Sequence, residues 1–187
     1  MEMARDDKWS RELWINAAYK RFEQSGLSSV KVEAIAKDLG ATKGSFYWHF
    51  TNRKSLIDAV MERWERSETD QIIVVAESSD TPQERLSVLY KVVAARASQR
   101  RGEVTLYVDA KREGVQEIVA RVSERRVGYI ADILVELGFE RDEAVRRGLV
   151  ATAVVLGLQQ LVVGAGQSRF KVSDEFTVTA LQMTLAR

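Results

Sequence analysis

The chain has 187 residues, a net charge of +1, no cysteine and one histidine. This composition excludes disulfides, thiolate or multi-histidine metal sites, and catalysis by a Cys–His pair. Because the overall charge is nearly balanced, any affinity for a polyanion must come from local charge.

Hydrophobic periodicity predicts an all-α protein. The chain has a single proline, Pro82, and no strand-like alternation extends beyond a few residues. The amino-terminal stretch MEMARDDKWSREL contains no apolar run of signal-peptide length, so we expect a cytoplasmic protein. We expect no metal and no cofactor.

The first expected helix runs from about Lys8 to Ser25 and ends at Gly26. Its apolar side chains form one stripe, as in a helix that covers a core. A second short helix is predicted from Val32 to Leu39, where apolar groups follow the spacing i, i+3, i+4, i+7 and Gly40 ends the pattern.

The stretch Ala41 to Phe50, ATKGSFYWHF, predicts a third short helix with Thr42 as its N-cap. Phe46 and Phe50 lie four residues apart, which suits burial, while the other side chains donate hydrogen bonds or stack. No acidic residue occurs between Asp38 and Asp58, so the local surface is positive. Two short helices joined by a tight turn are typical of a helix-turn-helix, whose second helix can lie in the DNA major groove.

These residues resemble the DNA-binding domain of the TetR family of transcriptional regulators. The resemblance is carried by Ile35-Ala36, Leu39 to Ser45, Tyr47 to Phe50, Arg53 and Leu56, and upstream by Trp14, Ile15, Ala17, Ala18, Phe22 and Gly26. It implies a three-helix helix-turn-helix domain at residues 1–53. An effector-binding and dimerisation domain would follow at residues 54–187, with about nine helices in the whole chain.

From side-chain chemistry and from this resemblance, we expect a set of DNA contacts near the second and third helices. They are Lys31, Thr42, Lys43, Gly44, Ser45, Tyr47, Trp48, His49, Arg53 and Lys54. Lysine can donate to phosphate or to guanine O6 and N7, and glycine allows the backbone to approach DNA closely. The resemblance implies that Tyr47 and His49 bind phosphate and that Arg53, where the family usually has lysine, clamps a phosphate together with Lys54. The alternative is a solvated helix face with two inward aromatics, in which His49 serves as a cap or core hydrogen-bonding group.

A long helix is predicted from Asn52 to about Val75, and it would join the DNA-reading domain to the rest of the chain as a lever. Thr81, Pro82 and Glu84 then mark a strong helix start with a capping box. That helix is predicted to end at Arg100-Arg101-Gly102.

A short helix at residues 104–108 and a long one at residues 114–137 are predicted next. The second carries Arg121, Arg125 and Arg126. Because glutamates lie close by in sequence, we interpret this cluster as a solvated, salt-bridged face rather than a second nucleic-acid patch.

The stretch from Leu149 to Gly166 approaches the length of a membrane span. Two adjacent glutamines near its centre and three glycines in its second half argue against a membrane. Small residues on one side would instead let another helix approach, and a last helix is predicted from Ser173 to Arg187. The expected dimer interface consists of Ala153, Gly157, Leu161, Gly164, Val178, Leu181 and Leu185.

The expected function is that of a homodimeric repressor that binds double-stranded DNA at a palindromic operator and is released by a small-molecule effector. Trp64, Tyr90 and Tyr107 are candidate effector contacts, although residues of this kind more often belong to the core. An activator with the same DNA-binding domain stays open, and so does a helical ligand-binding protein that does not bind DNA. We expect no enzyme, because the sequence shows no paired carboxylates at a marked site, no phosphate loop and no nucleophile with a base.

Overall fold

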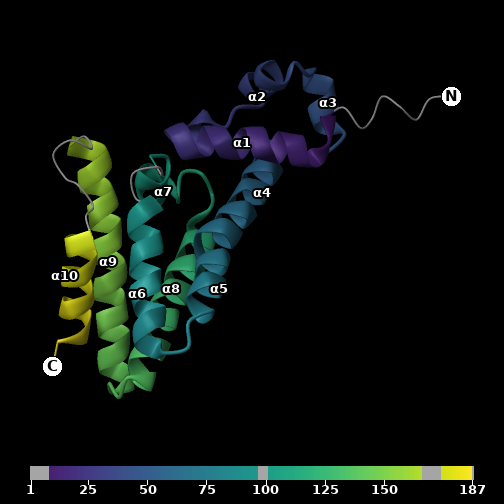
Figure 1. Ribbon diagram of the computed structural model, residues 1–187. Helices are drawn as coiled ribbons and strands as arrows, with labels where there is room; N and C mark the ends of the chain where they lie inside the picture. Colours follow the sequence, from purple (N-terminus) through teal and green to yellow (C-terminus); the bar gives the residue numbers. More distant parts are fainter. Residues whose placement is uncertain (1–8, 97–100, 166–173, 187) are drawn as a thin grey trace. The chain divides into compact units, whose positions relative to one another are not determined.

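A computed structural model describes residues 9–96, 101–165 and 174–186, and these residues form helices and no strand. The all-α prediction is therefore confirmed for the described part of the chain. The helices, drawn in Figure 1, are α1 (Arg11–Ser25), α2 (Val32–Leu39), α3 (Lys43–Tyr47), α4 (Arg53–Glu65), α5 (Gln71–Glu77), α6 (Pro82–Arg96), α7 (Glu103–Asp109), α8 (Gln116–Glu136), α9 (Arg141–Ala165) and α10 (Asp174–Leu185). A 3₁₀ turn, η2 (Leu27–Ser29), and a π turn, η3 (Arg66–Asp70), complete the helical elements.

Each of the nine expected helices has a counterpart when α4, η3 and α5 are taken together as the one long helix predicted after Asn52. Helix α6 ends at Arg96, and its predicted end at Arg100 lies outside the described residues. Two further features differ from the prediction. The π turn interrupts the long helix, and α9 begins at Arg141, well before Leu149. Its first turn is acidic rather than apolar, and Asp142 and Glu143 favour a helix start by complementing the helix dipole.

Local capping residues fix the starts of several helices. Thr42 Oγ1 and Asn52 Oδ1 each accept a hydrogen bond from the backbone N–H three residues later, at 3.2 and 3.0 Å. Thr81 and Glu84 form the expected reciprocal capping box, with both hydrogen bonds at 3.2 Å. These starts are therefore set by residues close in sequence.

Gly40 makes the turn between α2 and α3. Its backbone is left-handed, with φ 61° and ψ 30°, a conformation that costs residues with a Cβ more than it costs glycine. The N–H of Gly40 bonds the carbonyl of Lys37, and the N–H of Ala41 bonds that of Ala36. The tight turn predicted for a helix-turn-helix is thus present.

The chain divides into two compact units, which we name unit 1 (Met1–Trp64 and Arg101–Gln116) and unit 2 (Glu65–Arg100 and Glu117–Arg187). Unit 1 includes α7, because the chain returns to α1 at Gly102, whose N–H donates to the carbonyl of Glu23 at 2.8 Å. Inside unit 1, the indole N–H of Trp64 donates to Glu103 Oε1 at 3.0 Å, and both residues are buried. The functional division at residues 53/54 is not the division of the compact units and stays a prediction.

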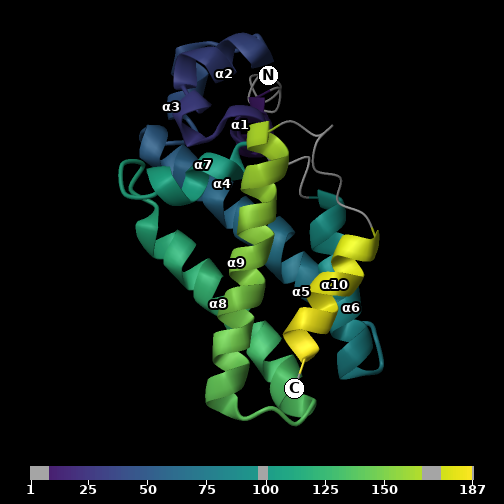
Figure 2. The ribbon, with the colours of Figure 1, turned by 90° about the vertical axis from the view of Figure 1, so that its left-hand side faces the viewer.

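Unit 2 contains α5, α6, α8, α9 and α10. Helix α6 packs against α5 and α10, and α10 also packs against α9 (Figures 1 and 2). The core of this unit is made of buried side chains from α6, α8, α9 and α10, namely Leu86, Tyr90, Ile130, Ala131, Ile133, Leu134, Ala144, Ala151 and Ala180. Helix α9 crosses α8 closely at Gly148, where an added Cβ would lie 2.7 Å from the carbonyl oxygen of Val127.

The close contact between Gly102 and α1 generates a stability prediction. A Cβ at position 102 would lie 1.5 Å from the carbonyl oxygen of Phe22, so Gly102→Ala must displace the backbone. We expect this substitution to lower the free energy of unfolding by about 3 kcal/mol or more in urea denaturation.

The matched control is Gly128→Ala in α8, where an added Cβ meets nothing within 4 Å. Replacing a glycine inside a helix by alanine should leave stability unchanged or raise it by up to about 1 kcal/mol. Equal stability of the Gly102→Ala and wild-type proteins would show that α7 does not pack on α1 in this way.

Candidate functional site

The third helix, α3, is anchored from its inner side by aromatic packing. Phe46 is fully buried, and its ring lies 5.3 Å from that of Trp14 in an edge-on arrangement and 5.3 Å from that of Phe50 in a stacked one. Burial of such rings is worth several kcal/mol, and their geometry is specific. The helix is therefore fixed in its rotation about its own axis, and its opposite side faces solvent.

The outer side of α3 carries large exposed aromatic groups. Tyr47 is 56% exposed and Trp48, at the C-terminal end of the helix, is 79% exposed. Of the other residues expected to contact DNA on this helix, Thr42, Lys43 and Gly44 are exposed, while Ser45 and His49 are half-buried. One edge contact holds Tyr47, whose ring centroid lies 5.2 Å from that of Phe46, but most of the Tyr47 and Trp48 surface faces solvent. Large exposed aromatic side chains in such a position suit a contact surface.

Lys43 pairs with an acid on the preceding helix. Its Nζ lies 2.6 Å from Glu33 Oε1, and both side chains are well exposed. The hydrogen bond to Glu33 raises the pKa of Lys43, and the same bond lowers the pKa of Glu33. An anionic partner of Lys43 would therefore have to compete with Glu33 for the ammonium group.

Lys31 and Lys54 are exposed beside this surface. Lys31 takes the N-cap position of α2 and makes no side-chain capping bond, while the Val30 side chain is fully buried. Lys54 forms an ion pair with Asp58 one turn further along α4. Both lysines can reach an external anion from these positions, because exposed ion pairs are weak and open easily.

Arg53 occupies a different environment from the one that a phosphate clamp needs. Its Nε donates to the carbonyl of Val30 at 2.6 Å, and its Nη2 donates to the carbonyl of Leu27 at 2.7 Å and to Glu113 Oε2 at 2.9 Å. The Glu113 side chain is only 7% exposed. Arg53 therefore fastens the loop before α2 to the loop after α7, and the role expected for it at a phosphate stays a prediction that these contacts do not favour.

Glu113 is not among the functional residues predicted from the sequence. It lies 60 residues from Arg53 in the chain, and no local pattern marks an acidic residue in a loop as the partner of a distant arginine. Only the pairing of a basic residue at the start of α4 with a buried carboxylate could have identified it, and burial is not visible in the sequence.

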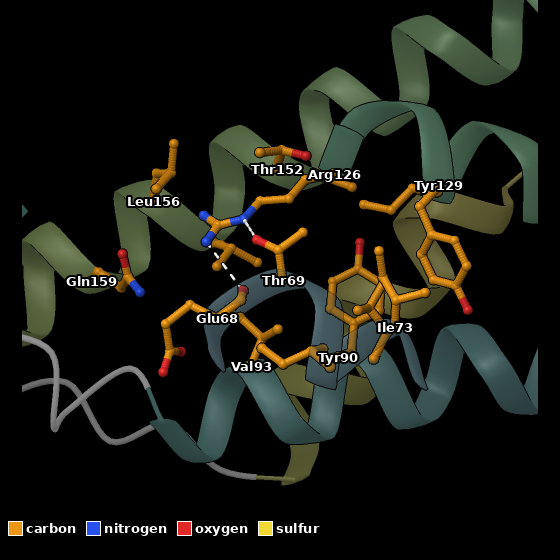
Figure 3. Close-up of a pocket in the computed structure, with 15 residues that line it drawn as sticks. Glu68, Thr69, Ile73, Tyr90, Val93, Arg126, Tyr129, Thr152, Leu156 and Gln159 are labelled. Atoms are coloured by element: carbon orange, nitrogen blue, oxygen red, sulfur yellow. Dashed lines mark hydrogen bonds between the residues drawn. The ribbon is translucent and has the colours of Figure 1, made fainter. Parts of the chain in front are cut away.

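Unit 2 contains a cavity of about 70 Å³ (Figure 3). Its lining comes from η3, α5, α6, α8 and α9 and consists of Glu68, Thr69, Ile72, Ile73, Leu89, Tyr90, Val93, Arg126, Tyr129, Ile130, Ala151, Thr152, Val155, Leu156 and Gln159. Most of these side chains are apolar, with a few polar groups among them, as in sites for small organic molecules.

Of the three residues expected to contact an effector, Tyr90 lines this cavity, and its hydroxyl lies 2.6 Å from Thr184 Oγ1. Burial raises the pKa of Tyr90. Trp64 and Tyr107 lie in unit 1 and do not line the cavity of unit 2. Trp64 instead serves the core of unit 1 through its bond to Glu103, because an apolar stripe in a sequence does not tell which of two cores it enters.

The basic cluster on α8 is tied to acidic and polar groups of α4 and η3. Arg121 pairs with Glu65 at 2.6 Å, Arg125 pairs with Asp70 at 2.8 Å, and Arg126 Nε donates to Thr69 Oγ1 at 2.9 Å. The interpretation as a salt-bridged face agrees with these contacts. The partners come from a distant segment rather than from the nearby glutamates of α8 that the sequence suggested.

An apolar surface extends along α9 and α10. The expected interface residues Ala153, Gly157, Leu161, Gly164 and Val178 are exposed, and Leu181 and Leu185 are half-buried against the core of unit 2. Other large apolar side chains exposed on these two helices are Val145, Leu149, Val150, Val154 and Met183. By length and composition alone α9 could cross a membrane, but the same features suit a helix that packs in a core or an interface.

The amino-terminal region is similar to known regulatory proteins. The family model for bacterial regulatory proteins, tetR family, matches residues 15–60. The HTH-type transcriptional regulator AcrR of Shigella flexneri is 36% identical over 61 residues, which cover 33% of this chain and 27% of that protein. The HTH-type transcriptional regulator TtgR of Pseudomonas putida is 26% identical over 131 residues, which cover 70% of this chain and 56% of that protein.

The chain therefore matches 27% and 56% of the length of these curated relatives. Among solved structures, the transcriptional regulator FadR from Bacillus subtilis in complex with stearoyl-CoA has a TM-score of 0.63 at 16% identity. That likeness covers 95% of this chain and 98% of the other. At such low identity it shows a shared fold.

The contacts of Arg53 generate a prediction about stability. Arg53→Met would remove this donor from two backbone carbonyls and from Glu113, which keeps Arg112 at 3.4 Å, so we expect a loss of about 1–3 kcal/mol in the free energy of unfolding. The measurement is urea denaturation of the full chain.

Lys54→Met is the matched control, since Lys54 is adjacent in sequence and its only ion pair in the described part of the chain is an exposed one with Asp58. We expect this control to cost no more than about 0.5 kcal/mol. If both variants lose the same small amount, Arg53 is not a structural fastener in unit 1.

Proposed function

The chain belongs to the TetR family of bacterial regulatory proteins, and from this premise we propose that it acts as a DNA-binding transcriptional regulator. We propose further that it is a repressor, released from a palindromic operator by a small-molecule effector. The observation that carries the proposal is the outward aromatic and basic side of α3, where Lys43, Tyr47 and Trp48 are exposed opposite the buried ring of Phe46.

Each exposed group on α3 has a role that follows from its chemistry. Lys43 would exchange Glu33 for a phosphate or for the acceptor edge of guanine. Tyr47 would donate its hydroxyl to phosphate and hold the register of the helix in the groove. Trp48 would pack on sugar or on a thymine methyl group, and the absence of a side chain at Gly44 allows the backbone to come close.

Thr42, Ser45, His49, Lys31 and Lys54 complete the proposed contact surface. Thr42 also caps α3, so its substitution would change both the helix and the contact. For Arg53 we propose a positioning role, because it holds the carbonyls of Leu27 and Val30 just before α2. It would then orient the helix-turn-helix without itself binding phosphate.

A single helix-turn-helix contacts few base pairs, so we propose a homodimer. Two copies related by a two-fold axis can read half-sites about 34 Å apart, one turn of B-form DNA. The apolar surface of α9 and α10 supports this proposal, since a second copy would remove it from water. The small residues Ala153, Gly157 and Gly164 would let the partner helix approach closely.

We propose that the effector enters the cavity of unit 2 and that residues 54–187 serve effector binding and dimerisation. Support comes from the mainly apolar lining of that cavity, and from the structural likeness to a regulator that binds stearoyl-CoA. The alternative of a helical ligand-binding protein that does not touch DNA is not favoured. Because the named relatives are regulators, we propose no catalytic role, and we propose a cytoplasmic location, where DNA is accessible.

The DNA-binding surface can be tested with a duplex that the wild-type protein selects from a random-sequence pool. We expect Lys43→Ala and Tyr47→Ala each to weaken binding at least about tenfold in fluorescence anisotropy. If Lys43 binds phosphate, its variant also flattens the plot of log affinity against log salt by about 0.9, because one fewer counterion is released.

Lys91→Ala, at an exposed position of α6 in unit 2, is the control and should leave both the affinity and the salt slope unchanged. If the folded Lys43→Ala and Tyr47→Ala proteins bind the duplex with the affinity of the wild-type protein, α3 is not the recognition element.

The dimer can be tested by light scattering of the full chain at micromolar concentration. We expect the wild-type protein to be a dimer and Leu161→Asp to be a monomer, because a carboxylate would be buried without a partner in the interface. Val108→Asp is the control, since Val108 lies in α7 of unit 1 and is 84% exposed, against 51% for Leu161. A monomeric wild-type protein, or a dimer unaffected by Leu161→Asp, would contradict this interface.

A further inference from the structure

The π turn η3 is held by arginine side chains. Arg126 Nη2 donates to the carbonyl of Glu68 at 3.1 Å, and Arg96 Nη1 donates to the carbonyl of Ser67 at 3.1 Å. The Arg126 Nε bond to the buried Thr69 hydroxyl adds a third contact. A π turn in an α-helix is rare and is frequently found at functional sites.

The same arginine lines the cavity of unit 2. Figure 3 shows Arg126 reaching from α8 to Thr69 and Glu68, with Gln159 of α9 at the same end of the cavity. The π turn therefore forms part of the cavity wall, and Arg126 contacts both.

Gln159 is a polar group in an apolar wall. Its residue is 3% exposed and lines the cavity. The side-chain amide of glutamine can both donate and accept hydrogen bonds. Gln159 therefore marks a place where an occupant of the cavity can form a hydrogen bond.

The remaining charges near the cavity are paired. The Glu68 carboxylate lies 3.6 Å from the guanidinium of Arg96, and Asp70 pairs with Arg125. Arg126 makes its contacts to Thr69 and to the Glu68 backbone with neutral acceptors. A ligand oxygen, neutral or anionic, can replace these neutral acceptors, and an anion would add an ion pair to the hydrogen bond.

The volume of the cavity limits the size of the ligand that can enter while the cavity wall stays in place. A cavity of about 70 Å³ is smaller than the roughly 150 Å³ that an apolar cavity needs to take up benzene. A ring-sized molecule can therefore bind only if part of the wall moves. Much of the wall is packed aliphatic side chain, whereas Arg126 can exchange one set of acceptors for another.

We propose that this cavity binds a small apolar molecule with one oxygen acceptor group, a carbonyl or a carboxylate, held between Arg126 and Gln159. The ligand oxygen takes over the donors of Arg126, so that the π turn loses its bonds at Thr69 and Glu68. The chain runs through this turn from α4 into α5, so a change of register there is transmitted along the backbone to α4. This regulatory step rests on the proposed function, whereas the ligand class does not.

The ligand class is tested by titrating the full chain, labelled at isoleucine methyl groups, with benzoate, benzamide and cumene, which have similar shapes. The methyl signals of Ile72, Ile73 and Ile130 report the cavity, and Ile57 in the core of unit 1 is the reference. We expect benzoate, benzamide or both to bind at least about tenfold more tightly than cumene, the difference of one good polar contact. Preference for benzoate identifies a carboxylate and preference for benzamide a neutral carbonyl.

Two substitutions test the proposed partners. Gln159→Leu and Arg126→Met should each weaken the preferred probe at least about tenfold while leaving cumene binding equal or tighter. Gln160→Leu, at the neighbouring exposed position, is the control and should change neither. The proposal would be overturned if cumene bound as tightly as both oxygen-bearing probes. It would also be overturned if the Gln159→Leu and Arg126→Met proteins kept the wild-type affinity, or if no probe shifted the methyl signals.

The link to DNA is measured separately with the selected duplex. We expect saturating amounts of the preferred probe to lower the DNA affinity of the wild-type protein by roughly 5- to 150-fold, and to have no such effect on Arg126→Met. If the wild-type protein binds no DNA, the proposed function fails while the methyl titration still decides the ligand class. If it binds DNA with unchanged affinity when the probe is bound, the coupling through the π turn is wrong.

Discussion

The burial of Phe46 is the contact on which the amino-terminal surface depends. A helix as short as α3 has little stability of its own, so its orientation must come from packing. The rings of Trp14 and Phe50 hold Phe46 from two sides, and the left-handed turn at Gly40 sets the direction in which the chain enters the helix. With the apolar side fixed, Lys43, Tyr47 and Trp48 can only face outward. Packing on the buried side of α3 thus determines which side chains are presented on its exposed side.

Arginine side chains hold irregular backbone in both units, since the planar guanidinium group can bind several acceptors at once. In unit 1, Arg53 joins two backbone carbonyls and a buried carboxylate across segments distant in sequence. In unit 2, Arg96 and Arg126 hold carbonyls of the π turn. Such contacts hold backbone that has no regular partner, and each can be exchanged for another acceptor.

The arrangement also explains why unit 1 is larger than a helix-turn-helix alone. Helix α7 is close to α1 at Gly102, its Glu103 accepts the indole N–H of Trp64, and Glu113 binds Arg53. Segments from both sides of residues 65–100 in the sequence therefore meet in unit 1. Two of the covalent connections between the units, at residues 64–65 and 116–117, lie within α4 and α8. A change within unit 2 can thus be passed on to unit 1 through the backbone.

The sequence by itself determined the local features. The helix starts at Thr42, Asn52 and Thr81 and the turn at Gly40 depend on residues within four positions of each other, so pattern and chemistry were enough to predict them. The division of α3 into a buried and an exposed side followed from the spacing of Phe46 and Phe50 in the same way. Only the tertiary structure decided the contacts of Arg53 with Glu113, of Trp64 with Glu103, and of Arg126 with the π turn. Those partners lie 39 to 60 residues apart, and which of many acids or carbonyls an arginine meets depends on how distant segments pack.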